Sequence, residues 1–316
     1  MANKLIVSAA PHITSADSTS KIMGRVCIAL LPTLIASVLI FGFQALLLTA
    51  VTVAACVVFE YAYCKLVGRD VTISDLSAVV TGLLLAFNLP AGLPVWMSLV
   101  GAFIAIVIIK QLFGGLGYNF ANPAIVGRIA MALGFTGAMT SYTYPENGID
   151  ALASATPLAV ADTAQNAGSY VTLLLGNHGG VLGETCALTL LLGGLYLIAT
   201  KVISPTIPVT YLATVAVLSL VSGRDPIYQL LSGGLMLGAF FMATDYVTSP
   251  TTTKGKIVFG LGLGVITCAI RFLGTMNEGV SFAILLMNLL VPYIEILTRQ
   301  DRLGIAKTKK KEGAAK

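Results

Sequence analysis

The sequence predicts an all-α integral membrane protein, and its composition carries that prediction. Of the 316 residues, 56% are hydrophobic, only 10% are charged, and the mean hydropathy is +0.89. Soluble domains carry about 25% charged residues, so a water-soluble fold is excluded. The apolar content is too high for a disordered chain, and five cysteines are too few for a disulfide-rich secreted protein.

Ten stretches of the chain are apolar and nearly free of charge, which is the pattern of helices that cross a bilayer. They cover residues 24–42, 44–64, 74–89, 94–113, 122–138, 182–200, 206–222, 228–244, 256–273 and 280–298. Several are short or contain Gly or Pro, for example Pro123 and Gly238. A membrane helix tolerates these residues where neighbouring groups satisfy the freed backbone. We therefore expect a tightly packed bundle with bent helices.

The distribution of Lys and Arg predicts the orientation of these spans, because cytoplasmic loops hold the positive charge. If residues 1–22 lie in the cytoplasm, 16 of the 19 basic residues fall on that side. They are Lys4, Lys21, Arg25, Lys65, Arg69, Lys110, Lys201, Lys254, Lys256, Arg299, Arg302, Lys307, Lys309, Lys310, Lys311 and Lys316. We therefore expect an even number of spans, with both termini, including the basic tail 299–316, in the cytoplasm.

A short internal match predicts that the bundle consists of two inverted halves. Gly68-Arg69-Asp70 recurs as Gly223-Arg224-Asp225, and Leu76-Ser77 recurs as Leu231-Ser232. The match relates the five spans in residues 23–138 to the five in residues 182–298, and because five is odd the halves point in opposite directions. Inverted repeats often build a site near the bilayer midplane. A chance match is the alternative.

One long polar connection, residues 139–181, separates the two halves and is expected to face outward. It contains no Lys or Arg, and Thr156 stands in it among small residues, followed by Pro157. Proline favours an extended backbone at the preceding residue, and small neighbours leave the hydroxyl accessible to another protein or a bulky group. On the residues alone, an ordinary loop threonine is the alternative to a modified one.

Two segments on the inner side place polar groups at membrane depth. Residues 114–124 contain several glycines with Asn119 and Asn122, and residues 242–253 contain Asp245 and Thr248. Such residues commonly cap helices, so capping is one interpretation. The other is that broken helices gather these groups around a ligand or an ion.

Ionisable residues inside membrane spans are costly and often functional. Glu60 and Asp245 are the best placed of them for a cation pathway, whereas a structural role is favoured for the rest. The two histidines, His12 and His178, are far apart, so no metal site is predicted. The basic residues lie in short gaps and in the tail, which is topology information and predicts no nucleic-acid binding.

Three motifs carry a resemblance to a known family. They are GGLGYNFANPAIVGR (114–128), SATPLA (154–159) and MATDYVTSP (242–250). In this order on ten spans they resemble the D subunit of the Rnf complex, an ion-translocating ferredoxin:NAD oxidoreductase. That protein is similar to the B subunit of the sodium-translocating NADH:quinone oxidoreductase, which usually has a longer N-terminal extension. The resemblance covers residues 21–302 and favours the Rnf protein, with the quinone-reductase B subunit as the alternative.

The resemblance implies two flavins. FMN would be joined through its phosphate to the hydroxyl of Thr156, which leaves the isoalloxazine ring free for one-electron transfer. Related attachment sequences often read Ser/Thr-Gly-Ala-Thr, so the flavin transferase must accept Ala153 and Ser154 here. A second flavin, riboflavin in the related quinone reductase, would bind without a covalent bond. Its candidate contacts are Asn119, Asn122, Asp245 and Thr248.

The expected function is that of a membrane subunit that couples electron transfer to Na+ or H+ transport. The expected partners are the other membrane and peripheral subunits of an Rnf-type complex, including a second subunit with covalent FMN, and the chain alone is not a complete enzyme. Two other classes stay open: a channel or secondary transporter built from inverted repeats, and a scaffold subunit without a cofactor.

Overall fold

The computed structural model is a bundle of helices in the residues that it describes, which are 17–142, 170–176, 178–184, 186–274 and 279–299. The first half contains α1 (Thr19–Phe41), α2 (Phe43–Val67), the short 3₁₀ turn η1 (Ile73–Asp75), α3 (Ser77–Phe87), α4 (Val95–Phe103), the π-helix η2 (Ile104–Gln111), α5 (Pro123–Gly134) and α6 (Thr136–Met139). The second contains α8 (Tyr170–Leu175), α9 (Ala187–Ala199), α10 (Thr206–Val221), α11 (Pro226–Leu231), α12 (Leu235–Leu237), the π-helix η4 (Gly238–Met242), α13 (Thr253–Leu273) and α14 (Val280–Leu297).

In the part of the chain that the structure describes, four helices are long and apolar enough to cross a membrane, as expected for a membrane protein. They are α1, α2, α13 and α14, and they are accompanied by shorter apolar helices. Every range predicted to span contains helix, although the range 228–244 is divided into α11, α12 and η4, and the range 122–138 is interrupted at Phe135.

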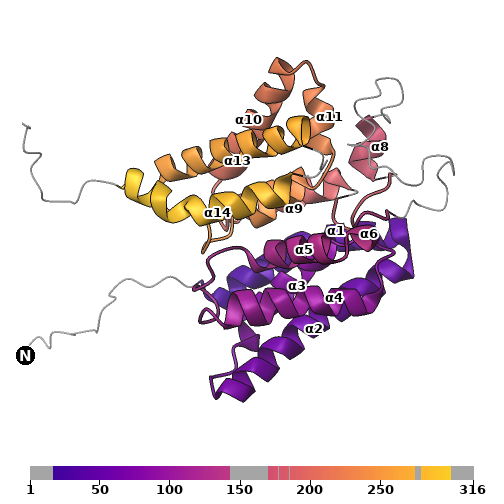
Figure 1. Ribbon diagram of the computed structural model, residues 1–316, viewed down its shortest axis with the longest axis vertical. Helices are drawn as coiled ribbons and strands as arrows, with labels where there is room; N and C mark the ends of the chain where they lie inside the picture. Colours follow the sequence, from indigo (N-terminus) through magenta and orange to yellow (C-terminus); the bar gives the residue numbers. More distant parts are fainter. Residues whose placement is uncertain (1–16, 143–169, 177, 185, 275–278, 300–316) are drawn as a thin grey trace, which may run out of the picture.

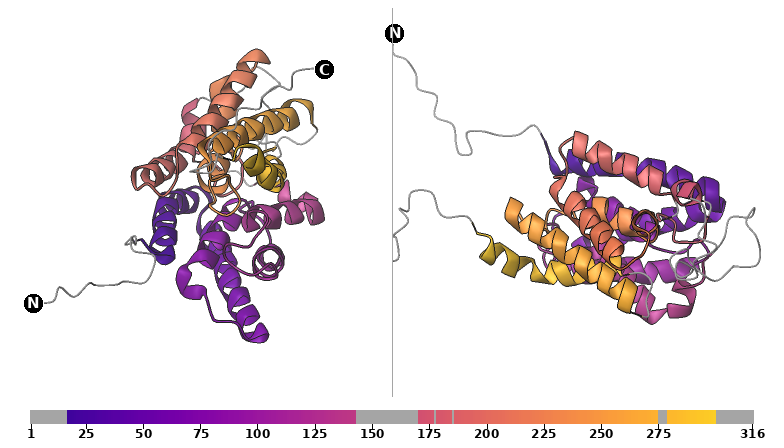
Figure 2. Two further views of the ribbon diagram at one scale, coloured as in Figure 1. Left: turned by 90° about the vertical axis from the view of Figure 1, so that its left-hand side faces the viewer. Right: turned by 90° about the horizontal axis from the view of Figure 1, so that it is seen from above.

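The two halves lie side by side, with α1 to α6 on one side of the molecule and α9 to α14 on the other (Figure 1). They meet where α1 packs on α9 and where α5 packs on α14. The beginning of α1 and the end of α14 lie at one end of the bundle, whereas α6 and α8 lie at the opposite end (Figures 1 and 2). The parts of the predicted polar connection that belong to α6 and α8 therefore lie at the end of the bundle away from the start of α1 and the end of α14.

The matched sequence segments form the same kind of helix end in both halves. Gly68 follows α2 with a φ of 73°, and Gly223 follows α10 with a φ of 70°. This left-handed backbone is the usual way in which a glycine ends a helix. The local match is therefore structural as well as sequential.

The chain just after the predicted polar connection turns back into the protein. The backbone N–H of Leu182 donates to the carbonyl of Leu89 at 3.0 Å, and that of Gly183 donates to the carbonyl of Phe87 at 2.8 Å. These bonds satisfy carbonyl groups at and just beyond the end of α3, which ends inside the bundle. A helix end buried away from water needs such partners.

Small residues allow the helices of the two halves to approach closely. At Gly193 in α9, an added Cβ would lie 2.3 Å from the carbonyl oxygen of Ala29 in α1. Close backbone approach at small residues is typical of membrane helix packing. The contact between α1 and α9 therefore depends on the missing side chain.

We expect Gly193→Ala to destabilise the protein, because the two helices must separate to accommodate the methyl group. Overpacking of a tight contact costs about 1–3 kcal/mol. The measurement is thermal unfolding of the purified chain in detergent. Gly134→Ala, where nothing lies within 4 Å of an added Cβ, is the matched control and should leave the unfolding temperature at or above the wild-type value. Equal unfolding temperatures for both variants would contradict the close contact.

Candidate functional site

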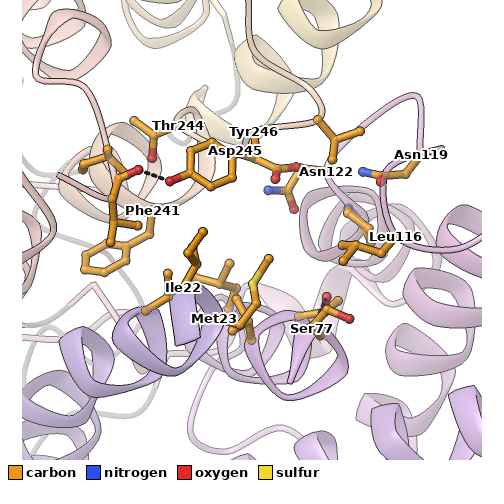
Figure 3. Close-up of a pocket in the computed structure, with 18 of the residues that line it drawn as sticks. Ile22, Met23, Ser77, Leu116, Asn119, Asn122, Phe241, Thr244, Asp245 and Tyr246 are labelled. Carbon is orange, nitrogen blue, oxygen red and sulfur yellow. Dashed lines mark hydrogen bonds between the residues drawn. The ribbon is translucent and has the colours of Figure 1, made fainter. Parts of the chain in front are cut away.

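A cavity opens between the two halves of the bundle (Figure 3). It contains about 800 Å³ of space between atoms, part of which is open to the surroundings. The first half contributes α1, α3, the end of η2, the glycine-rich loop after it and the start of α5. The second half contributes the end of α9, η4 and the segment that follows η4. Lining residues include Met23, Val26, Ser77, Lys110, Asn119, Asn122, Phe241, Thr244, Asp245 and Tyr246.

The glycine-rich loop brings the first asparagine to this cavity. Gly114, Gly115 and Gly117 have φ values of 127°, 95° and 95°. Residues with a side chain rarely adopt such backbone angles. They allow the chain to turn sharply after η2. Asn119 is buried, and its amide nitrogen donates to the carbonyl of Ala121 at 3.0 Å.

Asn122 caps α5 and joins the two halves. Its side-chain oxygen accepts from the backbone N–H groups of Ala124 at 3.1 Å and Ile125 at 3.4 Å, and Pro123 follows at the first helical position. Its amide nitrogen donates to the carbonyl of Met242 in η4 at 3.4 Å. The capping interpretation is confirmed for Asn122, which also lines the cavity.

Asp245 reaches the cavity from the second half, in the non-helical segment after η4. The hydroxyl of Thr248 donates to its Oδ2 atom at 3.1 Å. Burial raises the pKa of the Asp245 carboxyl, while the hydrogen bonds from Thr248 and from the backbone lower it. The neighbouring Tyr246 hydroxyl donates to the carbonyl of Val202 (Figure 3). Three of the four predicted flavin contacts therefore line one cavity. The fourth, Thr248, does not line it but donates a hydrogen bond to Asp245.

The structure corrects the interpretation of Lys110 as a charge in an inner connection. Lys110 lies within η2, its side chain is 2% exposed, and its Nζ atom is 2.7 Å from Oε2 of Glu60, which is fully buried. An ammonium paired inside the protein gives no information on topology. Glu60, predicted as part of a cation pathway, is thus bound to a cation supplied by the chain.

Two other ionisable residues of the spans make hydrogen bonds within the protein. Arg271 in α13 donates to the carbonyl of Gln229 at 2.8 Å and to that of Ser232 at 3.1 Å, so it holds the interrupted α11–α12 region. Glu295 accepts from the backbone and hydroxyl of Thr251 at 3.1 Å and 2.9 Å. Within the described ranges no three His, Cys, Asp or Glu side chains gather to hold a metal ion.

Two residues of the predicted outer connection stand out in the sequence. Thr156 lies outside the described residues. His178 lies in the described part of the predicted outer connection, where burial lowers its pKa to about 4. His178 is not among the described residues that line the cavity.

Comparison with known proteins agrees with the motifs. The NQR2, RnfD, RnfE family matches residues 6–304. The D subunit of the Na(+)-translocating ferredoxin:NAD(+) oxidoreductase complex of Acetobacterium woodii is 47% identical over 98% of this chain and 98% of its own length. The D subunit of the proton-translocating complex of Clostridium ljungdahlii is 42% identical over 96% of this chain and 97% of its own. The D subunit of the ion-translocating oxidoreductase complex of Alcanivorax borkumensis is 37% identical over 95% and 97%.

These matches confirm the expected resemblance to Rnf D subunits and the expectation of a subunit in an oxidoreductase complex. They cover both chains almost completely. The chain belongs to the NQR2, RnfD, RnfE family.

Proposed function

We propose that the chain is the membrane subunit of an ion-translocating ferredoxin:NAD+ oxidoreductase complex in a bacterial cell membrane. The observation that carries this proposal is the match to D subunits of such complexes along the full length of both chains. The protein carries FMN on Thr156, binds a second flavin without a covalent bond, and couples electron transfer to the transport of Na+ or H+. Its partners are the other subunits, one of which carries a second covalent FMN, and a flavin transferase attaches the FMN.

The cavity between the halves is the proposed site of the second flavin. Its walls are largely apolar, as a planar aromatic ring requires, and its polar groups are amides, a carboxylate and hydroxyls. The amides of Asn119 and Asn122 and the carboxylate of Asp245 can orient the polar edge of an isoalloxazine ring. Met23 and Phe241 line the same cavity and would exclude water from a bound ring. The flavin supplies one-electron transfer, whereas the protein supplies binding and orientation.

The proposed topology has ten spans in two inverted halves with both termini in the cytoplasm. The equivalent helix ends at Gly68 and Gly223 support the repeat, and the shared location of the start of α1 and the end of α14 supports an even number of spans. In this orientation the cavity opens on the inner side, and residues 139–181 lie outside. FMN on Thr156 and the second flavin would then occupy opposite sides of the membrane.

Ion transport by the assembled complex tests the proposal. Inverted membrane vesicles that contain the complete complex should take up radioactive sodium, or acidify, when ferredoxin is oxidised by NAD+. Vesicles without this chain should do neither, and a restored copy should recover both. A protonophore distinguishes the ions, because it abolishes acidification but leaves primary sodium uptake intact. Ferredoxin oxidation that proceeds normally without the chain, with ion movement unchanged, would contradict the proposal.

A further inference from the structure

The Lys110 ammonium is held by oxygen atoms inside the first half of the bundle. Its Nζ atom is 2.7 Å from Oε2 of Glu60 and 2.6 Å from Oγ of Ser77. The second oxygen of Glu60 accepts from the hydroxyl of Thr72 at 2.8 Å, and the Ser77 hydroxyl donates to Oδ1 of Asp75 at 2.5 Å. Carboxylate and hydroxyl oxygens are the ligands that hard metal cations prefer. The two oxygen atoms that contact the ammonium are thus of the kind that bind metal cations.

Such a buried pair is a poor device for stability alone. Burial of two charges costs free energy that their attraction repays only in part, and apolar residues of similar volume often serve equally well. Lys is also less suited than Arg to a fixed pair, because its ammonium is a compact point charge on a flexible stem. A lysine in this position is therefore suited to movement.

The position of Lys110 gives the ammonium a second place to go. Lys110 and Ser77 line the cavity between the halves, whereas Glu60 lies behind them and is fully buried. Lys110 belongs to the π-helix η2, in which the N–H of Leu112 donates to the carbonyl of Val107, five residues earlier. π-Helical geometry within a helix occurs frequently at functional sites. A negative charge in the cavity would attract the ammonium away from Glu60.

We propose that the oxygen atoms of Glu60 and Ser77 form an alkali-cation site that the Lys110 ammonium occupies at rest, while Thr72 holds the second oxygen of Glu60. The ammonium leaves when a ligand in the cavity becomes negatively charged, and Na+ takes its place beside Glu60. The trigger rests on the proposed function, because it requires a redox group in the cavity, whereas the cation site itself does not. Arrival of an electron and uptake of a cation are thereby linked through one side chain.

The test removes the internal cation and supplies an external one. Full-length wild type, Lys110→Met and the double variant Glu60→Gln/Lys110→Met are purified in detergent without added flavin. Thermal unfolding is compared in NaCl and in choline chloride at equal ionic strength. Wild type should unfold at the same temperature in both salts. Lys110→Met should unfold several degrees lower in choline chloride and recover most of the difference in NaCl, because Na+ replaces the ammonium. The double variant, which lacks the buried charge, should show no effect of Na+.

Direct binding gives an independent measurement. Lys110→Met should bind radioactive sodium in equilibrium dialysis, whereas the double variant should not. If Lys110→Met cannot be recovered in either salt, Lys110→Gln is measured in the same way, because glutamine keeps a hydrogen-bond donor without a charge. A Lys110 variant that is equally unstable in both salts and binds no sodium would overturn the cation site. Because no flavin is added, this failure is separate from a failure of ion transport in vesicles.

Discussion

Replacement of Thr156 by Val should abolish the covalent flavin of this chain completely. Val has almost the shape of Thr but lacks the hydroxyl, and without that oxygen no phosphoester with FMN can form. The chain is produced together with the flavin transferase and separated on a denaturing gel, which removes every flavin that is not covalently bound. Under ultraviolet light the wild-type band should fluoresce and the Thr156→Val band should be dark. Mass spectrometry of the peptide that contains Thr156 should show the added mass of FMN in wild type only.

Two variants of the same segment make this result specific. Ser154→Ala removes the other hydroxyl of the motif and should keep the fluorescent band, since Ser154 is not the attachment residue. Thr156→Ser restores a hydroxyl and should recover part of the fluorescence. An unmodified Thr156 in wild-type protein made with the transferase would contradict the proposal of covalent FMN. A fluorescent band in Thr156→Val would move the attachment to another residue.

The helices of this chain could largely be predicted from its sequence, because each long run of apolar residues has one stable conformation in a bilayer. The expected spans 24–42 and 280–298 correspond closely to α1 and α14. The interruptions could not be predicted in the same way. The range 122–138 is apolar along most of its length, yet its helix breaks at Phe135, and the range 228–244 is interrupted once, at residues 232–234. Hydropathy shows which segments are stable in a bilayer. It does not show which neighbouring groups form hydrogen bonds to the backbone where a helix is interrupted.

The site was predictable where polar residues interrupt apolar runs. Asn119, Asn122 and Asp245 stood out for this reason, and the structure brings all three to one cavity. Lys110 was missed as a site residue because a lysine near the end of an apolar run resembles an interfacial charge. Its partner Glu60 lies 50 residues earlier, and a single sequence contains no signal that pairs them. The sequence did contain one signal. A lysine at the end of the apolar run IAIVIIK is costly at membrane depth, which is typical of a functional residue.

Filling the cavity should remove the second flavin without affecting the first. Val26 lies on α1 and lines the cavity, so Val26→Phe places a ring in the space that the isoalloxazine ring would occupy. Overpacking costs about 1–3 kcal/mol, and since 1.4 kcal/mol is a factor of about ten in affinity, we expect roughly tenfold weaker binding or complete loss. The flavin released by acid from the purified chain is separated by chromatography and quantified per mole of protein. It should fall in Val26→Phe, while the fluorescent band of covalent FMN stays at the wild-type intensity.

Val58→Phe is the matched control, because Val58 lies on α2 with 59% of its surface exposed and does not line the cavity. It adds the same ring on the outer face of the bundle and should retain both flavins. Thr156→Val should show the reverse of Val26→Phe, with released flavin present and the covalent band absent. The two pools are thus independent because one depends on a bond to a single hydroxyl and the other on the shape of a cavity between the halves. A full complement of released flavin in folded Val26→Phe would place the second flavin elsewhere in the protein.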